Sequence, residues 1–183
     1  GVLEEDGIPM IALMTLPTDG ESAIVKVNAV RSVNEVLNAQ LYGWIFIDNA
    51  RIAALNPNVP IVEYHRAVNR WIVGPIDEWN RLNARAELKA IRSFDGEDFR
   101  KLLLPGGILD YANTTLPTLT AEAVIGFVHR SLEASELMPG GFDVKRISHL
   151  GVVIEASEAT LEKTPHAVFE SIFARLKSDT MGG

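Results

Sequence analysis

Cysteine is absent from the 183-residue sequence, and positive charge is scarce. The lack of cysteine excludes disulfides, thiolate metal sites and thiol nucleophiles, and it is compatible with a reducing cytoplasm. Seventeen basic against 24 acidic side chains give a net charge of −7, so we expect no uniformly basic surface of the kind that binds nucleic acid. Apolar residues make up 47% of the chain, a share typical of a globular protein that buries a core.

Signals for targeting or membrane insertion are missing as well. No apolar run approaches the roughly 18–20 residues that a membrane span needs. Residues 1–6 have neither the basic start nor the apolar stretch of a signal peptide, and there is no initiator methionine. We therefore expect a cytoplasmic protein without a direct membrane span. Because a strand-like apolar run begins already at Ile8, we also expect a fragment that starts inside a larger fold.

The first third of the chain alternates strand and helix patterns. The continuous apolar run Ile8–Leu16 is typical of a parallel strand covered on both faces. Apolar residues spaced three and four apart over residues 24–37 predict a helix. A second apolar run, Leu41–Asn49, predicts another strand, which ends in the polar pair Asp48-Asn49. Strand, helix and strand in this order predict a right-handed βαβ unit.

A longer helix and several shorter elements follow. A turn at residues 56–60 precedes a helical stretch from Ile61 to about Ala90, in which Gly74-Pro75 predicts a kink. The remaining predicted elements are a helix over 98–104, a strand over 108–116, a helix over 120–132, a strand over 147–156, and a helix to about Lys177 that has Thr164 as N-cap and Pro165 as first residue.

An acidic motif follows the long helix. The segment Ser93–Asp98 contains two carboxylates three residues apart, Asp95 and Asp98. In isolation Asp-x-x-Asp is a weak pattern, because either carboxylate could simply cap the next helix by accepting free backbone N–H groups. Two carboxylates on a rigid turn can also orient a water molecule or help to hold a cation. The two roles are compatible, since a capping carboxylate is already positioned.

Four local sequences, in this order, resemble the FtsZ/tubulin superfamily. Residues 7–17 resemble the FtsZ strand that ends in a Lys-Pro turn, and Trp44–Asn49 resembles the strand before the central helix, where tubulins also have an Asp-Asn pair. Residues 67–70 fall where FtsZ has an Asn-Asp pair on that helix, and residues 95–100 fall on the family's synergy loop. The resemblance covers nearly the whole chain and depends on order and spacing, since no single motif is decisive.

The resemblance implies an α/β fold in three parts. Residues 1–58 would form the last βαβ part of a Rossmann-like GTP-binding domain, and residues 59–92 the long central helix. Residues 93–183 would form an α+β activation domain that lacks its final strands. The family's glycine-rich phosphate loop, Gly-Gly-Gly-Thr-Gly-Thr-Gly, does not occur in the sequence and is expected upstream.

The resemblance also implies that the chain is part of a filament-forming cytoskeletal GTPase. In such a protein Asp95 and Asp98 would help to hydrolyse GTP bound to the adjacent subunit. The full-length, polymerised protein would bind GTP or GDP with Mg²⁺ and act as a GTPase, whereas this fragment alone would be inactive. Its partners would be further copies of itself in a head-to-tail filament, together with adaptor proteins.

Asn69 and Arg70 are the candidate residues for binding the cofactor. An amide can pair with both a donor and an acceptor on a guanine edge, although Asn69 could instead be buried and bonded to a neighbouring backbone group. Arg70 stands where the family has an acidic residue, and a cation cannot accept the guanine N1 and N2 protons. For Asp48-Asn49 we favour strand termination, with Asn49 in a turn conformation, over a nucleotide contact. The four histidines show no metal-ligand spacing, and no metal ligand is assigned.

Two other functions stay open. A non-catalytic FtsZ-like assembly or scaffold protein is favoured by Arg70 and by Ser93, which stands where the family has an Asn. An unrelated α/β enzyme would instead bind a small metabolite at a strand end, away from Asp95 and Asp98.

Overall fold

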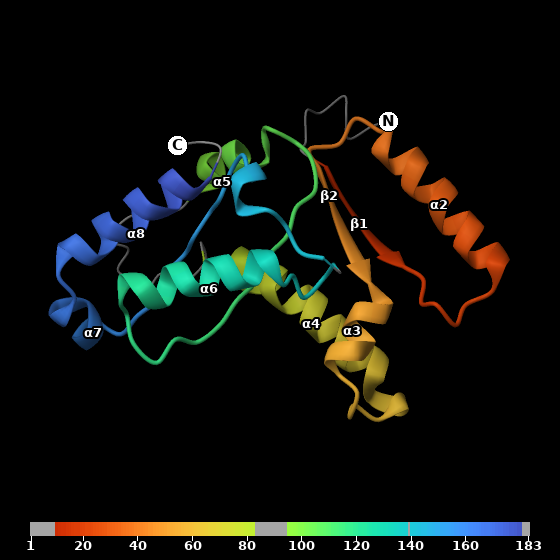
Figure 1. The fold of residues 1–183 in the computed structure, drawn as a ribbon, viewed down its shortest axis with the longest axis horizontal. Helices are drawn as coiled ribbons and strands as arrows, with labels where there is room; N and C mark the ends of the chain where they lie inside the picture. Colours follow the sequence, from red (N-terminus) through yellow and green to blue (C-terminus); the bar gives the residue numbers. More distant parts are fainter. Residues whose placement is uncertain (1–9, 83–94, 139, 181–183) are drawn as a thin grey trace. The chain divides into compact units, whose positions relative to one another are not determined.

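Two compact units make up the chain, which is a helix-rich α/β protein (Figure 1). The computed structural model describes residues 10–82, 95–138 and 140–180. The first unit holds the described residues up to Tyr111 together with Glu136–Met138, and the second unit holds the remainder. The boundaries expected from the resemblance, at residues 58 and 92, stay a prediction.

The first unit contains the parallel sheet. Its elements are β1 (Ile11–Leu16), α2 (Ala23–Leu37), β2 (Gly43–Asp48), α3 (Asn49–Leu55), α4 (Ile61–Leu82) and α5 (Gly96–Leu103). β1 and β2 pair in parallel, from Ile11 opposite Gly43 to Leu16 opposite Asp48. The predicted strand–helix–strand order is therefore confirmed, although Ile8 lies outside the described residues.

The second edge of β2 is also paired, but not by a regular strand. The backbone of Trp44 accepts a hydrogen bond from Leu109 N (2.8 Å) and donates one to Gly107 O (3.0 Å). Further along the same strand, Asp48 N donates to Leu137 O at 2.8 Å. The predicted strand over 108–116 is wrong: it shrinks to a single bridge between Trp44 and Ile108. Leu137 takes the N–H of Asp48 at the far end of this edge.

A short helix that the sequence analysis missed follows β2 directly. Asp48 ends the strand and caps α3, since its Oδ1 accepts from Ala50 N (2.7 Å) and Arg51 N (3.2 Å). The expected turn conformation at Asn49 is wrong, because Asn49 is the first residue of α3 and no described non-glycine residue has a positive φ. The Asp48 carboxylate favours a helix over a turn at this position, because it accepts hydrogen bonds from the first free N–H groups of that helix.

The core of the first unit lies between β2 and the helices that follow it. α4 contributes the buried Val68 and Ile72, whereas its Val62 and Val73 are exposed. Pro75 lies inside α4, where the predicted kink stays a prediction, and residues 83–90 of the predicted helix lie outside the described part. The buried core residues are Ile45, Ile47, Ile52, Val68, Ile72 and Leu137.

The regular elements among the described residues of the second unit are all helices. Its elements are α6 (Ala121–Glu133), the 3₁₀ helix η1 (Val144–Arg146), α7 (Glu158–Lys163) and α8 (His166–Asp179). α6 begins where predicted, with the Thr120 hydroxyl accepting from Ala123 N at 3.2 Å. Its buried core residues are Ala121, Val124, Val128, Ile172 and Leu176.

Two predictions for the second unit are wrong. Residues 147–156 form no strand, and the described residues of this unit contain no strand with which they could pair, so the expected α+β composition is not seen. Thr164 does not cap α8: it ends α7, where its hydroxyl donates to Thr160 O at 2.7 Å. α8 consequently starts at His166, with Pro165 as the residue before it.

None of the described helices combines the length and the apolar character required to cross a membrane.

Gly43 tests the packing of β2 against the 107–109 segment. A Cβ at this position would lie 2.6 Å from Leu109 Cδ1 and 3.2 Å from Gly107 O, whereas a Cβ at Gly74 would meet nothing within 4 Å. We expect Gly43→Ala to lower the free energy of unfolding by about 1–3 kcal/mol through overpacking. The control Gly74→Ala, inside α4, should be neutral or stabilising by up to about 1 kcal/mol. Urea denaturation checks both, and equal effects would contradict the close approach.

Tyr111 tests the attachment of the 107–111 segment to α4. Its hydroxyl donates to Ile72 O at 2.6 Å, and burial, aided by the charge of Asp110, raises the pKa of Tyr111 to about 12. As the pH rises, the Tyr111 phenol therefore loses its proton in the unfolded chain before it does in the folded one. The free energy of unfolding consequently decreases as the pH rises from about 10 towards 12. Tyr111→Phe should cost about 1 kcal/mol at neutral pH and remove that part of the alkaline decline.

Chemical denaturation at several pH values between 8 and 12 measures both effects. Tyr64→Phe is the matched control, because it removes a hydroxyl whose bond to Asn49 O is longer, at 3.3 Å. An unchanged alkaline slope in Tyr111→Phe would show that the phenol is not responsible.

Candidate functional site

The acidic turn before α5 is a complete capping box. Asp95 Oδ1 accepts from Glu97 N (2.9 Å) and Asp98 N (3.0 Å), while Asp98 Oδ2 accepts from Asp95 N at 3.5 Å. The helix expected over 98–104 therefore begins at Gly96, and the predicted capping role of the motif is confirmed. Ser93, at the start of the motif, lies outside the described residues.

The two carboxylates of the box remain open to solvent. Asp95 is exposed and Asp98 is half-buried. The capping bonds engage only Oδ1 of Asp95, and Asp98 Oδ1 lies 4.0 Å from Lys101 Nζ. Reciprocal bonding to the backbone restricts both side chains, so each presents a carboxylate oxygen in a defined place. Such a pair can orient water or assist a cation that arrives with a ligand.

An aromatic contact holds α5 against α4. The rings of Trp79 and Phe99 are 6.0 Å apart between centroids, at an interplanar angle of 49°. Phe99 follows the capping box directly, and its N–H donates to Asp95 O at 3.1 Å. The end of α4 and the acidic turn are thereby linked through one side-chain contact.

The proposed base-recognition residues lie elsewhere on α4. Asn69 and Arg70 are exposed beside the buried Val68, so the alternative of a buried, backbone-bonded Asn69 is wrong. Asn69 precedes Trp79 by ten residues, or about 15 Å of helix rise. Within the described part, no hydrogen bond or ion pair joins Asn69 or Arg70 to either carboxylate of the box. The roles of the two predicted groups therefore stay predictions.

The polar pair at the end of β2 serves local structure. Asp48 uses its carboxylate on two N–H groups of α3, and the Asn49 carbonyl accepts from the Tyr64 hydroxyl at 3.3 Å. Strand ends in parallel sheets are common ligand positions, and here one carboxylate oxygen, Oδ1, is used for capping. The expectation that Asp48 terminates the strand is confirmed.

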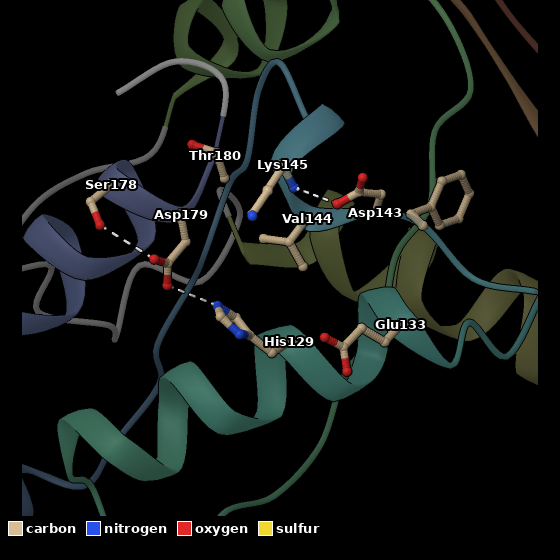
Figure 2. Close-up of a pocket in the computed structure, with 9 residues that line it drawn as sticks. His129, Glu133, Asp143, Val144, Lys145, Ser178, Asp179 and Thr180 are labelled. Atoms are coloured by element: carbon tan, nitrogen blue, oxygen red, sulfur yellow. Dashed lines mark hydrogen bonds and ion pairs between the residues drawn. The ribbon is translucent and has the colours of Figure 1, made fainter.

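A pocket of about 550 Å³ lies within the second unit (Figure 2). α6 contributes His129 and Glu133, η1 contributes Lys145 with Asp143 before it, and Asp179 comes from the end of α8. Figure 2 shows His129 directed at Asp179, with Nε2 and Oδ2 3.1 Å apart. The sequence analysis did not single out this group, because α6 and α8 are far apart in the chain and share no spacing pattern.

Two carboxylates of this pocket accept further hydrogen bonds. Asp179 Oδ2 also accepts from Arg175 Nε at 3.0 Å, and Asp143 Oδ1 accepts from Lys145 N at 3.0 Å. These bonds fasten helix ends, which is a structural role. Over residues 10–82, 95–138 and 140–180, no three His, Asp or Glu side chains gather as metal ligands would.

A small parallel sheet, a following long helix and a capped acidic turn define an α/β chain compatible with part of a Rossmann-like domain. No protein-family model matches the chain. Among curated proteins it is similar to TubZ, a tubulin-like protein, of Bacillus cereus and of Bacillus anthracis. In each case 27% of residues are identical over 124 residues, which cover 63% of this chain and 28% of the relative. The chain thus spans less than a third of the relatives' length, and the similarity supports a distant tubulin-like relationship.

The capping box is testable without any knowledge of function. Asp95→Ala removes the acceptor of two N–H groups and should lower the free energy of unfolding by about 1 kcal/mol. Asp95→Asn keeps an acceptor oxygen and should cost less. The control Glu97→Ala, on the same turn, removes only an exposed contact to Arg100 at 3.8 Å and should change stability by at most about 0.5 kcal/mol. Equal losses in Asp95→Ala and Glu97→Ala would contradict the box.

Proposed function

We propose that this chain is part of a filament-forming cytoskeletal GTPase of FtsZ/tubulin type. In the filament, Asp95 and Asp98 help to hydrolyse GTP bound to the adjacent subunit. The observation that carries the proposal is the capping box, which holds both carboxylates on a rigid helix start and leaves them accessible. The similarity to tubulin-like TubZ supports the class of protein.

The chemistry needed from these carboxylates is limited. GTP hydrolysis requires a water molecule in line with the terminal phosphate, while cations and dipoles offset the charge that develops. Asp95 has a carboxylate oxygen outside the capping bonds that can accept a proton of this water. Asp98 adds a second negative group that can orient the water or assist Mg²⁺ arriving with the nucleotide.

Action between subunits is what the resemblance to FtsZ and tubulin implies. Asn69, on α4, would meet the base of the nucleotide bound to its own subunit. In a head-to-tail filament, the acidic turn of one copy would complete the site of the next.

The residues present fit the nucleotide only in part. Asn69 is exposed and can pair with a guanine edge, whereas Arg70 cannot accept the guanine N1 and N2 protons. The sequence contains no glycine-rich loop to surround the phosphates, so phosphate binding must come from other polypeptide. GTP supplies the phosphoryl group that is cleaved, and this chain would contribute base contacts and the water-orienting carboxylates.

A second candidate is a non-catalytic FtsZ-like assembly or scaffold protein. Arg70 favours it, because the acidic partner expected for guanine is replaced by a cation. Such a protein would assemble without turnover, and the same variants distinguish the two functions.

The decisive experiment uses the full-length protein. Asp98→Asn and Asp95→Asn each remove one charge while keeping an acceptor oxygen for the capping box. We expect GTP turnover in each to fall on the order of 100-fold, the usual effect of removing one catalytic group. Sedimentation with GTP should show that assembly is retained, and wild-type turnover per subunit should rise steeply with protein concentration.

Glu97→Gln is the matched control, because it removes the same charge between the two aspartates. Its turnover should stay within about twofold of wild type, a surface substitution having little effect. Unchanged turnover in both Asp variants, or a rate per subunit that does not depend on concentration, would reject the acidic turn as a site acting between subunits. Assembly without any GTP turnover in the wild type would favour the scaffold.

A further inference from the structure

The pocket of the second unit contains two charged side chains that have no partner among the described residues. They are Glu133, the last residue of α6, and Lys145 in η1, and Figure 2 shows them on opposite sides of the pocket. Over residues 10–82, 95–138 and 140–180, no ion pair or side-chain hydrogen bond engages the Glu133 carboxylate or the Lys145 ammonium. Polar groups that converge on a cavity in this way can orient a ligand.

The acidic group at the end of α8 is already engaged. Asp179 Oδ2 accepts from Arg175 Nε at 3.0 Å and lies 3.1 Å from His129 Nε2. The other oxygen, Oδ1, accepts from Ser178 Oγ at 3.3 Å. These contacts hold the end of α8 in place, and the arginine offsets the charge of the carboxylate. The two unpaired groups on α6 and η1 are therefore the ones that remain for a ligand.

The charges of the pocket favour a ligand that carries both signs. A purely anionic ligand would meet the carboxylates of Glu133, Asp143 and Asp179, and a purely cationic one would meet Lys145; like charges at short range repel. α6 and α8 both end at the pocket, and the C-terminal ends of helices favour positive charge. An ammonium group is therefore favoured beside Glu133, and a carboxylate beside Lys145.

The remaining lining and the size of the pocket suit an apolar group. Phe142 and the buried Val144 contribute apolar surface beside the two charged groups. The volume of about 550 Å³ lies within the range of about 300–1,000 Å³ that is usual for small-molecule sites. An α-amino acid with a large apolar side chain has an ammonium, a carboxylate and an apolar group, which are the three features that this lining would contact.

We propose that the pocket between α6, η1 and the end of α8 binds a free α-amino acid with a large apolar side chain. Its ammonium pairs with Glu133, its carboxylate pairs with Lys145, and its side chain contacts Phe142 and Val144. The proposal concerns the second unit alone and does not depend on GTP hydrolysis.

Three matched probes test the need for both charges. L-phenylalanine carries both, phenylpropanoate lacks the ammonium, and phenylethylamine lacks the carboxylate. Each is titrated into the isotope-labelled 183-residue chain while backbone amide shifts are followed by NMR. L-phenylalanine should bind with a Kd on the order of 1 mM or below and shift amides of residues 142–145 and of the ends of α6 and α8. Each analogue should bind about tenfold more weakly or worse, because it lacks one charge-assisted contact.

Two pocket variants test the assigned contacts. Glu133→Gln and Lys145→Gln each remove one charge from an exposed side chain and should weaken L-phenylalanine binding about tenfold or more. Glu162→Gln and Lys163→Gln are the matched controls, since they make the same changes at exposed positions of α7 outside the pocket lining. Their Kd should stay within about twofold of wild type, and thermal unfolding of all four variants should match wild type, as expected of surface substitutions.

Several results would overturn the proposal. One is the absence of saturable shifts with L-phenylalanine, and another is shifts confined to residues outside the pocket. Equal binding of L-phenylalanine and either singly charged analogue would show that the pocket does not select both charges. Unchanged affinity in Glu133→Gln and Lys145→Gln, or equal losses in the α7 controls, would reject the assigned contacts.

Discussion

The backbone pairing of β2 along both edges is the constraint on which the first unit depends. β1 bonds to one edge over six residues, and Trp44 and Asp48 bond to Gly107, Leu109 and Leu137 on the other. Each of these bonds satisfies a backbone polar group that the burial of β2 would otherwise remove from water. The absence of a side chain at Gly43 permits this approach, and Asp48 then turns the end of the same strand into the start of a helix.

The acidic turn combines a structural and a chemical property in the same atoms. A carboxylate that caps a helix is restrained by the N–H groups from which it accepts hydrogen bonds, and its negative charge lies at the positive end of the helix dipole. Restraint and charge are also what a water-orienting group requires. A stability measurement on Asp95 therefore cannot by itself establish a role in hydrolysis, and only the charge-removing, cap-preserving substitutions separate the two properties.

Local sequence patterns predicted the individual helices and strands better than they predicted which segments contact one another. The apolar run ending at Leu16 and the Thr120 cap each contain their own signal, and the structure agrees with both. The run over 147–156 also contains several apolar residues but finds no partner strand in the described residues, and a strand depends on its neighbours. The pocket around His129 and Asp179 was not predictable, because those residues meet only through the packing of α6 against α8. Asp95 and Asp98 were identified by spacing and order, while their use in catalysis stays a prediction.

The bond from Asp48 to the Leu137 carbonyl has a consequence for how the protein folds during synthesis. These partners are separated by about 90 residues, and pairs so distant in sequence raise the contact order and slow folding. The ribosome must release the whole of α6 before the second edge of β2 can close. Until then the Asp48 end of that edge lacks its partner, and an open strand edge can pair with other chains.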